Sequence, residues 1–157
     1  MKLIKKNKTF VIAEIGMSHH GNIGIAHSLI DTISKTGVDA VKFQTHYAQH
    51  ESTMNEKFRN NTLAHYKNRY NYWKSTEFSD DEWISLLNHC KKNKIHFISS
   101  PFSLFAAKFL NKIGMKIWKI ASGEINNFEM LDFIRNTKKP IILSTGMSLL
   151  NETKKTF

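Results

Sequence analysis

The residues best suited to chemistry lie in segment 118–125, where an apolar run ends in a turn that contains glycine. This segment carries a cation, a hydroxyl and a carboxylate in Lys119, Ser122 and Glu124. A short strand that delivers such groups at its C-terminal end is how a βα-barrel builds an active site. Apolar runs that finish in polar groups recur at 11–16, 40–44, 96–101 and 141–146. The sequence therefore predicts a site assembled from the ends of several strands.

Helical patterns separate these strand-like runs. Apolar residues recur at helical spacing after four capping candidates, which are Asn22, Ser79, Ser103, and Asn126 or Asn127. Gly37 and Gly114 are placed to end two of the helices, and Pro140 prevents the fourth from continuing. A fifth helix is expected to open near residue 151. Strict alternation of strands and helices predicts a parallel sheet with right-handed crossovers.

Segment 45–78 joins the second predicted strand to the helix that follows Ser79 and is too long for an ordinary βα connection. We expect it to form a lid over the mouth of the barrel. Its aromatic residues, among them Trp73, alternate with basic residues such as Arg69 and could also form a nucleic-acid surface. A lid packed locally on the barrel is the favoured interpretation.

The length of the chain limits how much of a barrel it can form. Its 157 residues accommodate about five βα units of about 31 residues each, whereas a closed eightfold barrel needs about 250 residues. The predicted fold class is therefore α/β, the N-terminal portion of a TIM-type (β/α) barrel. We expect residues 1–157 to form one partial barrel domain that is truncated part-way round.

The composition favours a globular protein with a basic surface. The formal net charge is +10, but the lysines fall in scattered pairs, which indicates a solvated surface rather than a nucleic-acid interface. The single Cys90 cannot form an internal disulfide and lies on an apolar helical stripe, as a buried structural thiol would. No apolar run approaches the roughly 18 residues of a membrane span. We expect a cytoplasmic protein that binds neither nucleic acid nor membrane.

Five motifs occur in order along nearly the whole chain. They are Ala-Glu-Ile-Gly-Met-Ser-His-His-Gly-Asn at 13–22, Val-Lys-Phe-Gln-Thr at 41–45, Ser-Pro-Phe at 100–102, Lys-Ile-Ala-Ser-Gly-Glu-Ile at 119–125 and Leu-Ser-Thr-Gly-Met at 143–147. Each motif alone is weak evidence. Together, at this spacing, they resemble the N-acetylneuraminate (sialic acid) synthase family.

The resemblance implies a specific reaction. That family condenses phosphoenolpyruvate with an N-acetylated amino sugar such as N-acetylmannosamine, giving a nonulosonic acid and phosphate. Its catalytic βα-barrel is followed by an antifreeze-like domain that reaches the partner's active site in a homodimer. A divalent metal ion, Mn²⁺ or Mg²⁺, polarises the sugar aldehyde. The family's metal-binding histidines lie on later strands, so we expect this chain to lack the metal ligands, the C-terminal strands and the antifreeze-like domain.

The resemblance also assigns residues to the phosphoenolpyruvate site. A compact polyanion needs cations and hydrogen-bond donors held close together. Lys42 and Lys119, at the ends of the second and fourth predicted strands, are the candidate cations. By resemblance, Ser100, Ser122 and Ser144 add hydroxyl or backbone donors, and position 100 is more often threonine in relatives. The alternative to an anion site is that both lysines simply extend from the strand ends into solvent.

Acids and an amide are expected on the sugar side. Glu14 and Glu124 align with the acids that the family uses to hold or activate the sugar, and Gln44 is a further contact. The alternative for Glu14 is a strand-end carboxylate paired with a nearby lysine. Adjacent His19 and His20 do not suit one metal ion without a third ligand. A loop-shaping or sugar-facing role is favoured for His19.

Two other functions stay open at this point. The chain could belong to a synthase of a related nonulosonic acid, such as legionaminic acid, pseudaminic acid or a spore-coat sugar. It could also be a truncated remnant that does not catalyse the reaction. That would be the case if the later strands and the metal ligands were lost.

Overall fold

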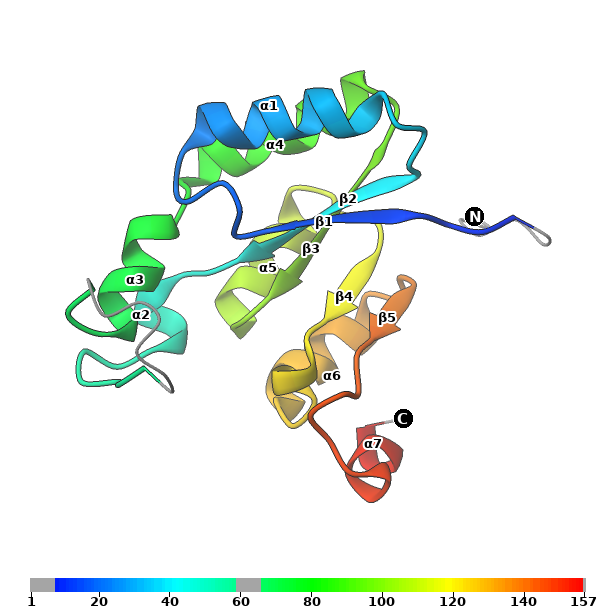
Figure 1. Cartoon of the computed structure of the whole chain (residues 1–157). Helices are drawn as coiled ribbons and strands as arrows, with labels where there is room; N and C mark the ends of the chain where they lie inside the picture. The colour runs from blue at the N-terminus through cyan, green and yellow to red at the C-terminus, as the bar shows by residue number, and fades with distance from the viewer. Residues whose placement is uncertain (1–7, 59–65, 157) are drawn as a thin grey trace.

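The structure is a computed structural model that describes residues 8–58 and 66–156. Within these residues, five parallel strands form one sheet in the order β1-β2-β3-β4-β5 (Figure 1). The strands are Ile12–Gly16, Ala40–Thr45, His96–Pro101, Trp118–Ile120 and Ile141–Leu143. Because each strand pairs with the next along the chain without a reversal, the sheet advances as a βα-barrel does. The predicted α/β class and the five βα units are confirmed.

Helices follow the strands as the alternation predicted. They are α1 (Ile23–Ser34), α2 (Ala48–Glu51), α3 (Arg69–Thr76), α4 (Asp80–Lys92), α5 (Leu104–Lys112), α6 (Phe128–Asn136) and α7 (Leu150–Thr156). A short 3₁₀ turn, η2 (Ser122–Glu124), follows β4. None of the helices in the described part of the chain combines the length and the apolar character that crossing a bilayer requires.

Side-chain caps explain where the helices begin. The side chains of Asn22, Ser79, Ser103 and Asn127 each accept a hydrogen bond from the first turn of the helix that follows. At Ser79 the contact is reciprocal, because Glu82 also accepts from the Ser79 backbone N–H. Gly37 and Gly114 follow α1 and α5 with positive φ, as expected of residues that end helices.

The two faces of the sheet carry different side chains. One face packs against α1, α4, α5 and α6 and forms the main core, where Phe43, Trp83 and Trp118 are buried. The other face carries a smaller apolar cluster of Ala40, Ile98 and Ile117, packed with Phe10, Ile12 and Ile142. Side chains alternate along a strand. A residue two positions after a member of this cluster therefore points to the same face. Five residues stand in this relation to the cluster: Glu14, Lys42, Ser100, Lys119 and Ser144.

Segment 45–78 contains α2 and α3, which lie beyond the carboxyl end of β2 (Figure 1). The end of α3 packs tightly on the turn after β1: Gly21 has a φ of +73°, and a Cβ there would lie 2.1 Å from the carbonyl oxygen of Ser75. Glu77 accepts a hydrogen bond from the backbone N–H of Ala48 at 2.5 Å. The first contact seats α3 on the turn after β1, and the second joins α2 to the chain after α3; residues 59–65 of the predicted lid lie outside the described residues.

Candidate functional site

A lysine cluster lies on the face of the sheet turned away from the helices, in the carboxyl-terminal part of β3, just after β5 and midway along β1, β2 and β4. It consists of Glu14, Lys42, Ser100, Lys119 and Ser144, one residue from each of the five strands or the turn directly after it. Lys42 Nζ lies 2.8 Å from a carboxylate oxygen of Glu14 and donates to Ser100 Oγ at 3.5 Å. Lys119 donates to Ser144 Oγ and to the carbonyl oxygen of Ile120. Strand register, rather than sequence proximity, brings these groups together.

The electrostatics of the lysine cluster suit a compact anion. The Lys42 side chain is only 9% exposed, whereas that of its partner Glu14 is 54% exposed. Burial, and then the neighbouring charge of Lys42, lower the pKa of Lys119, and Glu14 opposes the shift. Two ammonium groups close enough to repel each other are balanced here by one exposed carboxylate, that of Glu14. Such a pair of cations favours a ligand that adds negative charge.

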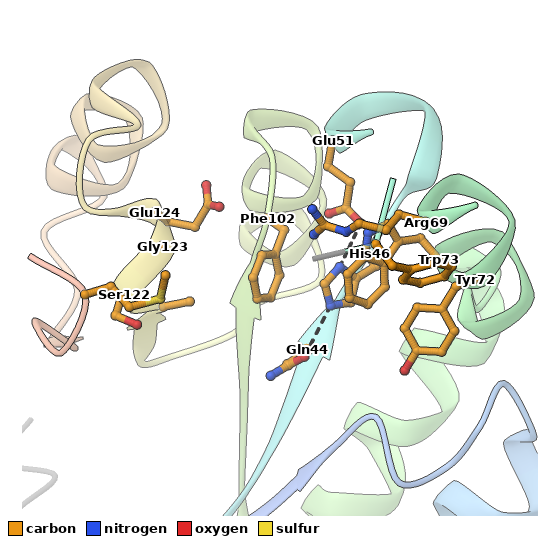
Figure 2. A pocket seen from close by; sticks show the side chains of 13 residues that line it. Gln44, His46, Glu51, Arg69, Tyr72, Trp73, Phe102, Ser122, Gly123 and Glu124 are labelled. Atoms are coloured by element: carbon orange, nitrogen blue, oxygen red, sulfur yellow. Dashed lines mark hydrogen bonds and ion pairs between the residues drawn. The ribbon is translucent and has the colours of Figure 1, made fainter. Parts of the chain in front are cut away.

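A cavity of about 470 Å³ opens beside the lysine cluster. Its lining comes from the ends of β2 and β3, from α2 and α3 and the chain between them, from η2 and from the turn after β5. The lining residues are Gln44, His46, Glu51, Phe58, Arg69, Tyr72, Trp73, Phe102, Ala121, Ser122, Gly123, Glu124 and Met147. Figure 2 shows Ser122 and Glu124 on one side of Phe102, and His46 and Trp73 on the other. Lys42 and Gln44 are two residues apart on β2 and share a face, so the cavity and the lysine cluster adjoin.

Glu124 is the carboxyl group on the η2 side of this cavity. Burial raises its pKa and nearby Glu51 adds to the shift, while a 2.9 Å hydrogen bond from the Asn127 amide opposes it. A carboxyl group with a raised pKa holds its proton more readily than an ordinary glutamate, and its oxygens can accept hydrogen bonds from sugar hydroxyls. Glu124 therefore suits a polar, uncharged ligand better than a second anion.

The structure divides the eight residues predicted from the sequence between two places. Five of them form the lysine cluster, and the other three, Gln44, Ser122 and Glu124, line the cavity. Ser122, predicted as a donor to the anion like the other serines, opens η2 and lines the adjoining cavity. The alternative considered for Glu14, a carboxylate paired with a lysine, also describes its contact with Lys42.

Two further residues of the cavity were not predicted from the sequence, His46 and Glu51. His46 is stacked between Trp73 and Phe102 and contacts both Gln44 and Glu51. One signal was available, because His46 follows Gln44 by two residues and continues the same inward alternation. No local pattern pointed to Glu51, whose place depends on how α2 folds back over the strand ends.

His19 and Cys90 are structural residues here. His19 is fully buried, accepts a hydrogen bond from the Gly21 backbone N–H at 3.1 Å and packs against Phe78. Burial lowers the pKa of His19 to about 4 and raises that of Cys90 to about 12. His19 thus shapes the turn that receives α3. Among residues 8–58 and 66–156, no three His, Cys, Asp or Glu side chains are grouped so that they could hold a metal ion.

Known structures share this fold. N-acetylneuraminic acid synthetase from Leptospira borgpetersenii superposes with a TM-score of 0.79 at 28% identity, over 96% of this chain and 49% of that chain. A truncated 3-deoxy-D-arabino-heptulosonate 7-phosphate synthase from Thermotoga maritima superposes with a TM-score of 0.64 at 13% identity, which supports the barrel fold alone.

Relatives found by sequence identify the family more closely than the shared fold does. The N,N'-diacetyllegionaminic acid synthase of Campylobacter jejuni is 39% identical over 148 residues, which cover 92% of this chain and 44% of that protein. The N-acetylneuraminate-9-phosphate synthase of Mus musculus is 29% identical over 160 residues, covering 97% and 43%. The chain thus spans less than half the length of these relatives. Residues 29–157 match the sequence profile of the NeuB family, and the chain belongs to that family.

Proposed function

We propose that this chain carries the phosphoenolpyruvate site and part of the acceptor site of a NeuB-type synthase. The reaction condenses phosphoenolpyruvate with an N-acetylated amino sugar, such as N-acetylmannosamine, to give a nonulosonic acid and phosphate. The observation that carries the proposal is the lysine cluster, in which five successive strands each contribute one group to a single anion site.

The residues of the lysine cluster have distinct roles in this proposal. Lys42 and Lys119 bind the carboxylate and phosphate of phosphoenolpyruvate, and the hydroxyl groups of Ser100 and Ser144 donate to the same oxygens. Glu14 holds the Lys42 ammonium in place through their 2.8 Å contact. Fixing the enol at this edge of the sheet leaves its C3 atom free to attack an aldehyde in the adjoining cavity.

The cavity residues act on the acceptor. Glu124 accepts hydrogen bonds from sugar hydroxyls, and its raised pKa lets it hold or release a proton as the aldehyde oxygen becomes a hydroxyl. Gln44 orients the acceptor beside the enol. C–C bond formation is then followed by addition of water at C2 and loss of phosphate from the tetrahedral intermediate.

A divalent ion, Mn²⁺ or Mg²⁺, is part of the proposed activity because it would polarise the aldehyde. The described residues offer no group of three ligands for it, so its ligands would have to come from elsewhere in the enzyme. The roles given to Lys42, Lys119 and Glu124 do not depend on the ion. From the family resemblance we also propose a homodimer that acts in the cytoplasm.

A related acceptor is the second candidate. The legionaminic acid synthases of Campylobacter jejuni and Legionella pneumophila are 39% and 33% identical to this chain, compared with 28–30% for the animal N-acetylneuraminate-9-phosphate synthases. This difference favours a diacetamido sugar over N-acetylmannosamine. Competition between the two sugars for the same cavity distinguishes the candidates.

An NMR titration of the ¹⁵N-labelled chain tests the proposal. Phosphoenolpyruvate is expected to shift the signals of the lysine cluster, and an N-acetylated amino sugar those of Glu124, Gln44 and their neighbours. Perturbations confined to scattered surface lysines would contradict the anion site. No perturbation by either compound would favour the alternative, a non-catalytic remnant.

A further inference from the structure

The ring of His46 is held in a fixed plane. It is buried, with 2% of the side chain exposed, directly after β2. Trp73 of α3 and Phe102 at the end of β3 stack on its two faces, with ring centroids 4.0 and 4.2 Å away and interplanar angles of 6° and 21° (Figure 2). With the plane fixed by aromatic neighbours, the two ring nitrogens point in fixed directions.

Each ring nitrogen has one partner. Nε2 lies 3.3 Å from Gln44 Oε1, and Nδ1 lies 2.7 Å from Glu51 Oε1. An amide oxygen can only accept, so the proton of the neutral ring is on Nε2 and Nδ1 is the acceptor. Glu51 must then donate, which requires its carboxyl group to be protonated. The three side chains form a chain of hydrogen bonds from Glu51 through His46 to Gln44.

The surroundings of Glu51 favour the protonated form. Its side chain is 6% exposed, and its Oε2 atom has no hydrogen-bond partner among the described residues. Burial raises the pKa of Glu51 to about 8; the charges of Glu77 and Glu56 add to this and Arg69 opposes it. Burial also lowers the pKa of His46 to about 3, against the charge of Glu124. At neutral pH, therefore, both groups are uncharged.

We propose that His46 is a positioning residue for the acceptor side of the cavity. By donating from Nε2 to Gln44 Oε1, His46 turns the Gln44 NH₂ group towards the ligand, where it donates to an oxygen atom of the acceptor. Trp73 stacks on the same ring, so the packing of α3 and the orientation of the amide depend on one side chain. The identity of the ligand that Gln44 meets rests on the proposed function.

The hydrogen-bond chain can reverse. When Glu51 loses its proton, its carboxylate can only accept, and the proton of the neutral His46 ring moves from Nε2 to Nδ1. Nε2 then becomes an acceptor, so the Gln44 amide has to rotate and present Oε1 to the cavity. The charged and titratable groups that act on Glu51 during this change are His46, Arg69, Glu56, Glu77 and Glu124.

Ring-nitrogen NMR of the ¹⁵N-labelled chain tests this arrangement without reference to activity. At neutral pH we expect His46 to show a protonated Nε2 and an unprotonated Nδ1, and to exchange the two as pH rises through about 8. Glu51→Gln should abolish that exchange, because its amide NH₂ donates to Nδ1 at every pH. An imidazolium ring, or an Nδ1–H ring at neutral pH, would overturn the proposal.

Substitution of the ring tests the effect on Gln44. His46→Phe retains the two stacking faces and removes both hydrogen bonds, so the Gln44 side-chain NH₂ signals should lose their fixed environment. His50→Phe is the matched control, because His50 is an exposed residue of α2 that stacks on Phe105. Unchanged Gln44 signals in His46→Phe would contradict a positioning role.

A double-mutant cycle connects the arrangement to binding, with N-acetylmannosamine as the probe. His46→Phe is expected to weaken binding about tenfold alone and to have no further effect in the Gln44→Ala background. Independent, additive losses would show that His46 does not act through Gln44. If the unmodified chain binds no sugar, the proposed function fails, and the ring-nitrogen spectra still decide the role of His46.

Discussion

Replacing Lys42 with methionine is expected to weaken phosphoenolpyruvate binding while leaving the fold intact. Methionine has a similar length, is apolar, and suits a side chain that is 9% exposed. The lysine's partner, Glu14, is 54% exposed, so it does not become an unpaired buried charge. The substitution therefore removes a cation from the lysine cluster without the penalty that breaking a buried ion pair would bring.

The expected magnitude follows from one lost charge-assisted contact. Such hydrogen bonds contribute on the order of 2 kcal/mol, which corresponds to about a 30-fold rise in Kd. Lys119 does not lose its charge in the variant, because removing the Lys42 charge removes one of the causes that lower its pKa. The change in affinity should therefore report the missing Lys42 contact rather than failure of the whole cluster.

Isothermal titration calorimetry at two salt concentrations measures this effect. Lys116→Met is the control, because Lys116 is exposed and precedes β4 at the opposite end of the sheet. We expect the control to bind like the unmodified chain, and binding to weaken as salt rises. Equal losses in both variants would indicate general attraction by a basic surface and would refute the anion site.

Three further results are expected. In a synthase that carries this segment together with the metal ligands, Glu124→Gln should leave the circular dichroism spectrum unchanged but lower phosphate release from phosphoenolpyruvate and N-acetylmannosamine by about 100-fold, since the amide cannot transfer a proton; normal turnover would make Glu124 a structural acid. Ser79→Ala should cost about 1 kcal/mol in urea unfolding, because it removes one half of the α4 capping box, and no change in the midpoint would contradict this. The Glu51→Gln protein should lose less stability than the unmodified chain as pH rises from about 4.5 to 8. The folded unmodified protein holds the Glu51 proton up to about pH 8, whereas the unfolded chain releases it at lower pH, so rising pH favours unfolding only when Glu51 is present. Parallel curves of stability against pH would count against the raised pKa.

Local signals accounted for the strands and helix starts. Asn22, Ser79 and Ser103 cap the helices that follow them, because a capping contact spans only a few residues and is visible in the sequence. The choice of Lys42 and Lys119 as candidate cations followed from the apolar runs that carry them and from the family resemblance.

The sequence was less informative where the chain folds back on itself. The contact between His46 and Glu51 requires α2 to return over the end of β2, and the stack on Trp73 requires α3 to be packed against the turn at Gly21. Neither depends on a repeating pattern. The motif at 119–125 likewise did not show that the chain after β4 turns into η2, which places Ser122 in the cavity lining.

Each strand contributes one residue to the lysine cluster, so the site forms only when all five strands are paired in the correct register. A slip of one residue at β2 would exchange the two faces of that strand, moving Lys42 among the helices and Phe43 into the anion site. Such a chain would lose core packing and ligand binding together, so misaligned molecules should be both unstable and unable to be rescued by phosphoenolpyruvate. The ligand would then stabilise correctly aligned sheets selectively, since it binds groups that come together in one register alone.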